Sequence, residues 1–146
     1  MKTPFWCVGS FMSVAAAALG QCLDEAKLVQ LSESYMKRSG TAVALSGSRA
    51  IVGSVAGGVT VYAEDAAGWA IDGELPGGSY AGYSGGVAID GGRAFVGNII
   101  GPVREYLRGP SGWQEVASIP NPAGDGAGVF GVSMAFHGTR LAVLCR

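Results

Sequence analysis

Short apolar segments alternate with glycine-rich turns along most of this chain. Four segments of strand length follow one another, with apolar or small residues at alternate or neighbouring positions: 41–45, 49–52, 59–62 and 69–75. Turn sequences separate them: Ser46-Gly47-Ser48, Gly57-Gly58 and Asp65 to Gly68. Glycine tolerates the positive φ that tight turns require. The pattern predicts four antiparallel strands joined by short turns.

The same sequence pattern recurs 44 residues later. Residues 87–113 match residues 43–69 at 12 of 27 positions without a gap. The matches include a Tyr and a Gly-Trp pair in each copy: Tyr62 with Tyr106, and Gly68-Trp69 with Gly112-Trp113. The second copy predicts strands at 86–89, 93–96, 103–107 and 113–119. A period in the forties that holds four short strands is typical of a β-propeller blade.

Partial copies flank these two. Residues 134–143 match the first hairpin of a copy, and Ala26–Leu31 resembles a fourth strand. The expected units are 26–38 (partial), 39–82, 83–126 and 127–146 (partial). We therefore expect an all-β fold of antiparallel four-stranded propeller-type blades, forming an incomplete β-propeller, because a closed ring usually needs four to eight blades.

An open stack of blades exposes apolar faces and unpaired strand edges. Three arrangements would follow from this. The chain is a fragment of a longer propeller, it assembles with copies or partners through open blade edges, or residues 26–31 clasp the terminal hairpin in a distorted closed sheet. The sequence favours the fragment.

The first twenty residues are of a different kind. Lys2 is followed by an uncharged apolar stretch from Phe5 to Leu19, and Ala18 and Gly20 stand at the small-residue positions of a cleavage site. This layout predicts a secretory signal peptide at 1–20, a mature domain at 21–146, and no stable membrane span after cleavage. The alternatives are an uncleaved anchor and a buried first element.

Charge and cysteine content bear on the partners of the protein and on its compartment. The net charge is −1 and no basic run is present, so we expect no nucleic-acid partner. Removal of the signal would leave Cys22 and Cys145 near the two ends. In an oxidising compartment they could form a disulfide; the alternative is two separate thiols, and their spacing matches no metal motif.

The third copy carries a family resemblance. Its segment Gly124-Asp125-Gly126-Ala127-Gly128-Val129-Phe130-Gly131 resembles the loop and Phe-Gly pair of FG-GAP repeats, the integrin-α-like β-propellers. Ser39-Gly40 and Ser84-Gly85 stand at the Phe-Gly position of the earlier copies. The resemblance implies an extracellular or periplasmic recognition surface. Many relatives hold calcium through an Asp-rich loop, but the acidic residues here are scattered, so we expect neither calcium nor another cofactor.

Few single residues suggest chemistry. His137 is the only histidine and stands at a turn position shared with Ser46 and Asp90, so we expect an exposed turn residue and no enzyme activity. The paired tryptophans and tyrosines are expected to pack between blades. Tyr80 and Tyr83 lie in a loop before the second copy, where they could contact a ligand or cap the adjoining blade.

These observations predict a secreted, non-catalytic propeller segment that recognises an extracellular protein or glycan through blade loops or exposed edges. One alternative is a truncated structural fragment with no ligand of its own. Another is an accessory domain of an extracellular hydrolase.

Overall fold

The computed structural model describes residues 39–54, 58–75, 85–98, 101–124 and 129–145. Strands make up 76% of these residues and none of them is helical. The predicted all-β class with antiparallel sheets is therefore confirmed. No helix long and apolar enough to span a bilayer occurs within the described ranges.

The first copy of the repeat forms one antiparallel sheet in the order β1-β2-β3-β4. Its strands are β1 Ser39–Ser46, β2 Arg49–Ser54, β3 Gly58–Asp65 and β4 Gly68–Leu75. Gly47, in the turn between β1 and β2, has a φ of 55°. A side chain would be strained there, which explains why the turn contains glycine.

The second copy forms a second sheet in the same order, β5-β6-β7-β8. Its strands are β5 Val87–Asp90, β6 Arg93–Val96, β7 Val103–Gly109 and β8 Gly112–Ile119. The irregularities match as well, because the register shifts between Val61 and Tyr62 in the first sheet and between Glu105 and Tyr106 in the second. The repeat seen in the sequence is thus a repeat of structure, down to one bulge.

The third copy supplies a two-stranded sheet among the described residues. Here β9 Phe130–His137 pairs with β10 Arg140–Cys145. The hairpin closes through the pair His137 and Arg140, as the earlier hairpins close through Ser46 with Arg49 and Asp90 with Arg93.

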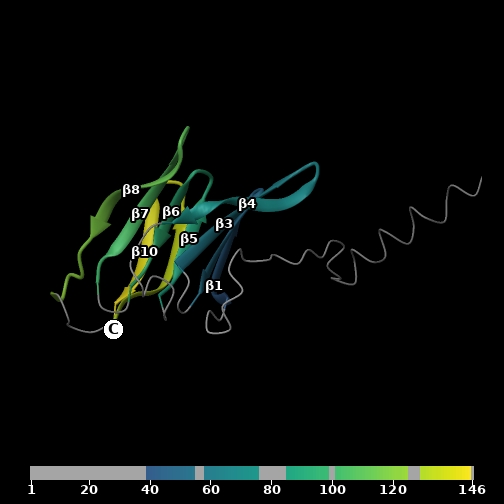
Figure 1. Cartoon of the computed structure of the whole chain (residues 1–146). Coiled ribbons are helices and arrows are strands. Elements are labelled where there is room, and N and C mark those ends of the chain that lie inside the picture. The colour runs from purple at the N-terminus through teal and green to yellow at the C-terminus, as the bar shows by residue number, and fades with distance from the viewer. Residues whose placement is uncertain (1–38, 55–57, 76–84, 99–100, 125–128, 146) are drawn as a thin grey trace, which may run out of the picture.

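The three sheets stack face to face in chain order, and β1 lies beside β5, which lies beside β9 (Figure 1). We call the side of a sheet that packs on the next sheet its forward face, and the opposite side its backward face. Side chains alternate between the faces because successive residues of a strand point to opposite sides.

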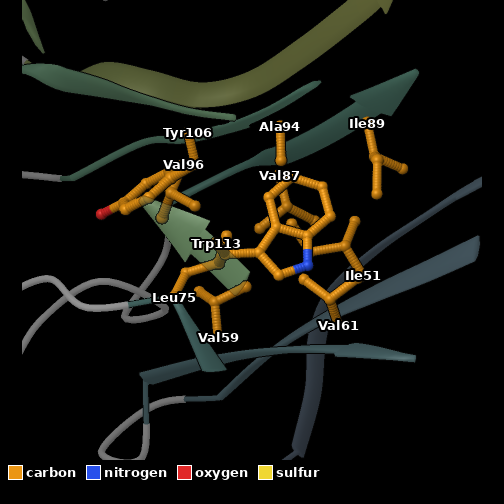
Figure 2. Close-up of a cluster of buried hydrophobic side chains, with 10 residues drawn as sticks. All are labelled: Ile51, Val59, Val61, Leu75, Val87, Ile89, Ala94, Val96, Tyr106 and Trp113. Atoms are coloured by element: carbon orange, nitrogen blue, oxygen red, sulfur yellow. The ribbon is translucent and has the colours of Figure 1, made fainter. Parts of the chain in front are cut away.

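An apolar core fills the space between the first and second sheets. Figure 2 shows the Trp113 ring among side chains that come from both sheets. The forward face of the first sheet contributes Ile51, Val59, Val61 and Leu75, and the backward face of the second contributes Val87, Ile89, Ala94, Val96, Tyr106 and Trp113. The expectation that the second-copy aromatics pack between units is confirmed for Tyr106 and Trp113.

A second core joins the second and third sheets at equivalent positions. Ala88, Phe95 and Val103 of the second sheet meet Phe130 of the third, with partly buried residues around them: Ile119, Met134, Phe136, Leu141 and Val143. Phe95 contacts Phe136 edge to face, with ring centroids 4.7 Å apart. The two cores join the described sheets into one continuous stack, and these sheets do not form a closed ring.

Glycine allows the second and third sheets to approach closely. Gly131, the glycine of the Phe-Gly pair, has a φ of 79° and lies against the Cα of Gly97. Its carbonyl accepts a hydrogen bond of 2.6 Å from the Gly86 N–H. A side chain at Gly97 would collide with the Gly131 backbone, and one at Gly131 would collide with Val103 and Gly97, so the close approach requires glycine at both positions.

Candidate functional site

The most connected polar group in the described residues is the carboxylate of Asp72 on β4. Arg108 of β7 donates to both oxygens, with Nε 2.9 Å from Oδ1 and 2.8 Å from Oδ2 and Nη2 2.7 Å from Oδ1. Trp113 Nε1 donates to Oδ2 at 3.0 Å, and Arg49 Nε lies 3.5 Å from the same oxygen. Because Arg108 and Trp113 belong to the second sheet, the cluster joins the first two sheets.

A β-bulge places Asp72 at this junction. Val61 pairs with Gly73 and Tyr62 pairs with Ile71, so Asp72 is the extra residue of β4. A bulge turns its extra side chain away from the regular alternation. The Asp72 side chain is only 8% exposed. Its counterpart in the second sheet is Val116, an apolar side chain that is 49% exposed.

The environment of Asp72 fixes its ionisation. The hydrogen bond from Arg108 holds the pKa of Asp72 below its ordinary value, against the opposing effect of burial, and the hydrogen bond from Trp113 also lowers it. The same carboxylate raises the pKa of Arg108. Both carboxylate oxygens already accept hydrogen bonds, which makes Asp72 a structural anion with no free oxygen for a substrate.

A second polar series runs along the hairpin turns. The Gly91 N–H donates to Ser46 Oγ at 3.3 Å, and the Gly138 N–H donates to Asp90 Oδ2 at 2.6 Å. In both cases the acceptor is the side chain just before the turn of one sheet. The donor is the backbone N–H of the turn glycine in the next sheet. Ser46 Oγ also donates to Asp90 Oδ1 at 3.0 Å. The turns of the three sheets are therefore linked in order.

This arrangement lowers the pKa of Asp90. The Gly138 backbone N–H is the main cause that lowers the Asp90 pKa, followed by the Ser46 hydroxyl. His137 Nδ1 lies 3.6 Å from Asp90 Oδ2, and the His137 side chain is 100% exposed, as predicted. His137 is the last residue of β9 and stands next to the turn.

Arg49 and Arg93, which occupy equivalent positions in the first two sheets, each have a carboxylate neighbour. Arg49 lies near Asp72, and Arg93 Nε contacts Glu105 Oε1 at 2.6 Å. The Arg93 guanidinium also lies 5.4 Å from the ring centroids of Phe95 and Phe136. Arg93 thus covers the second core, a packing role for its charge.

In the described part of the chain, the third sheet has an unpaired edge and an open face. Among the described residues β10 pairs only with β9, whereas its counterparts β2 and β6 each pair on both sides. An open depression of about 310 Å³ lies on the forward face of this hairpin, lined by Ser133, Met134, Ala135, Ala142, Val143 and Leu144. Leu144 is 51% exposed.

The site residues singled out in the sequence fall mostly elsewhere. Tyr80, Tyr83 and Cys22 lie outside the described residues, as does the expected signal segment 1–20, so these predictions stay predictions. Cys145 is exposed at the end of β10, where its Sγ lies 3.8 Å from Asn121 Oδ1.

Sequence reasoning missed the cluster around Asp72, because it treated the acidic residues as scattered. A signal was present in the comparison of the two copies. Asp72 stands where the second copy has Val116, and Arg108 stands where the first copy has Glu64. Such paired differences between repeats mark residues that serve one junction only.

Within the described ranges, no group of three His, Cys, Asp or Glu side chains could hold a metal ion. Comparison of the chain with protein-family models, with curated proteins and with solved structures finds no match.

Proposed function

We propose that this protein is a secreted, non-catalytic recognition module of the FG-GAP β-propeller type, which binds a protein ligand by pairing an extended strand of it with β10. One observation carries the proposal: β10 has a single ladder partner among the described residues, although the equivalent strands β2 and β6 have two. A free strand edge offers unpaired backbone N–H and C=O groups to an incoming strand.

The register of the hairpin identifies the groups on this edge. His137 and Arg140 flank a two-residue turn, so they form a hydrogen-bonded pair, and the next bonded pair along the ladder is Ala135 with Ala142. The N–H and C=O groups of Leu141 and Val143 then point away from β9. These two residues would form the hydrogen bonds to a bound strand.

The carboxylates of Asp72 and Asp90 already accept hydrogen bonds within the fold, which supports recognition over catalysis. Both oxygens of Asp72 accept hydrogen bonds within the fold, and Asp90 Oδ2 accepts the Gly138 N–H. His137 is fully exposed, and its acidic neighbour is Asp90, which already accepts the Gly138 N–H. A general acid or base needs a proton path to a substrate, which these pairings do not leave open.

A peptide with the sequence of residues 103–109 is a suitable probe, since this segment is β7 and pairs with β6 in the second sheet. We expect it to bind the purified chain and to shift the backbone amide resonances of β10. If it adopts the β6–β7 register, its Leu107 residue lies opposite Arg140, the counterpart of Arg93.

The Val143→Pro variant removes an outward N–H and is expected to abolish binding. Val143→Ala is the matched control, because it loses the same side chain yet keeps the N–H and should still bind. Circular dichroism checks that both variants are folded. Equal binding by the two variants, or no shift in β10 at saturating peptide, would refute recognition through this edge, and binding of glycans alone would replace it with the glycan alternative.

A further inference from the structure

Each junction inside the chain repeats one set of contacts. On the forward face, Ala44 of β1 and Ala88 of β5 occupy the same position in their sheets. On the backward face of the following sheet, Val87 and Ile89 of β5 pack on the first sheet, as Met134 and Phe136 of β9 pack on the second. Small residues on one face thus receive large apolar residues from the next.

The third sheet repeats the small residue of this forward pattern. Ala135 stands at the position of Ala44 and Ala88, whereas Ala142 replaces the larger Ile51 and Phe95 of the earlier sheets. Both line the depression of about 310 Å³ on the forward face of the hairpin, beside Leu144. In the described residues, the forward face of the third sheet therefore has the small-residue surface that receives a following sheet.

The first sheet presents the complementary backward pattern. Val43 and Leu45 of β1 are each 67% exposed, whereas their counterparts Val87 and Ile89 are 5% and 4% exposed. On the same face Ala50 and Tyr62 are buried, so the free part of the face runs along β1. This free part is the strand that lies beside the preceding sheet at each junction within the chain.

We propose that a second copy of this chain docks head to tail, with its β1 placed on the β9–β10 hairpin of the first copy. Val43 and Leu45 of one copy would enter the depression beside Ala135, Ala142 and Leu144 of the other. The contact continues the two junctions already present in the chain, and it is independent of the proposed strand binding, because it uses the face of the hairpin and not the edge of β10.

The turn series supports the same partner. Ser46 accepts a hydrogen bond from the Gly91 N–H, and Asp90 accepts one from the Gly138 N–H. The residue just before each turn thus accepts a hydrogen bond from the next sheet. His137 holds this position in the third sheet and its side chain is 100% exposed. In the docked pair, the Gly47 N–H of the second copy would be the donor to His137.

A head-to-tail contact uses two different surfaces, so it can extend to further copies. The surfaces are confined to β1 and one hairpin, which places the contact at the small end of protein interfaces. We therefore expect an association that depends on protein concentration and yields more than a dimer.

Two variants separate the surfaces. Leu45→Glu blocks the backward surface and Ala142→Glu blocks the forward one, and both positions are exposed, so the fold should tolerate the change. In analytical ultracentrifugation each variant alone should stay monomeric. An equimolar mixture should form a one-to-one dimer, twice the monomer mass and no larger, because one intact surface of each kind remains. Leu107→Glu, at an exposed apolar position outside both surfaces, should assemble like the unmodified chain.

A monomeric unmodified chain at every concentration would overturn the proposal. So would self-association of either variant at the level of the unmodified chain, because a contact between like surfaces predicts that result. If the chain is monomeric and amide exchange shows the β1 face to be protected, residues of the same chain cover that face, which also rules out the second copy.

Discussion

Arg108 donates to both carboxylate oxygens of Asp72 across the boundary between two sheets. The two residues are 36 positions apart, and each lies at a position where the other copy of the repeat has an unrelated side chain. The pair is specific to one junction in an otherwise repetitive structure. It also brings Trp113 and Arg49 to the same carboxylate.

Replacement of Asp72 should weaken the stack. Asp72→Asn removes the charge that Arg108 and Trp113 contact, and we expect a loss of about 1 to 3 kcal/mol in the free energy of unfolding, as for a poorly exposed charged hydrogen-bond partner. Urea unfolding followed by tryptophan fluorescence measures it. The exposed pair Arg104 and Glu115, 3.1 Å apart, provides the control, and Glu115→Gln should cost under about 1 kcal/mol. Equal losses would contradict a special role for Asp72.

Acid should destabilise the protein through Asp72 and Asp90. Their pKa values are lowered in the fold from the ordinary value of 3.8, so the carboxylates contribute stability that is fully present above that value and is lost as the pH falls through the folded-state pKa values. The free energy of unfolding, measured in urea between about pH 5 and pH 2.5, should fall towards the acid end. Asp72→Asn should flatten the curve, and an unchanged slope would show that the Asp72 pKa is not lowered.

Gly131 should tolerate no side chain. A Cβ there would lie 2.6 Å from Val103 Cγ2 and 3.0 Å from Gly97 Cα, at a φ of 79°. We expect Gly131→Ala to cost about 2 to 5 kcal/mol through strain and overpacking. Gly47→Ala is the matched control, because Gly47 also has a positive φ but faces open space, and it should cost only about 1 to 2 kcal/mol. Thermal unfolding of both variants tests the difference.

The two repeated tryptophans should differ in energy although they match in sequence. Trp113 is buried between two sheets and donates to Asp72, whereas Trp69 is half-buried. Trp113→Phe should cost about 2 kcal/mol, because it removes a hydrogen bond to a charged group. Trp69→Phe should cost under about 1 kcal/mol. Similar losses in chemical unfolding would mean that the two positions have equivalent surroundings.

The strands could be predicted from the sequence because local signals agree with the fold. The glycine turns and the alternation of apolar residues lie within one copy, and the repeat shows them a second time. In the structure the bulge beside Tyr62 recurs beside Tyr106. The incomplete propeller and the FG-GAP assignment stay predictions, because the described sheets test neither of them.

The polar clusters could not be predicted in the same way. Asp72 meets Arg108 only because a bulge turns its side chain towards the neighbouring sheet, and a bulge of one residue leaves no mark in the hydrophobic pattern. The turn contacts of Ser46 and Asp90 likewise depend on how neighbouring sheets pack on each other. The predicted ligand residues Tyr80 and Tyr83 remain untested by the described residues.

Two units of similar sequence could exchange positions in the stack during folding. The contact between Asp72 and Arg108 gives the correct arrangement an advantage. If the second unit preceded the first, Val116 would stand at the position of Asp72 and Glu64 at that of Arg108, leaving an acid opposite an aliphatic side chain. Two residue differences between the copies, Asp72 against Val116 and Arg108 against Glu64, thus favour one order of the sheets over the other.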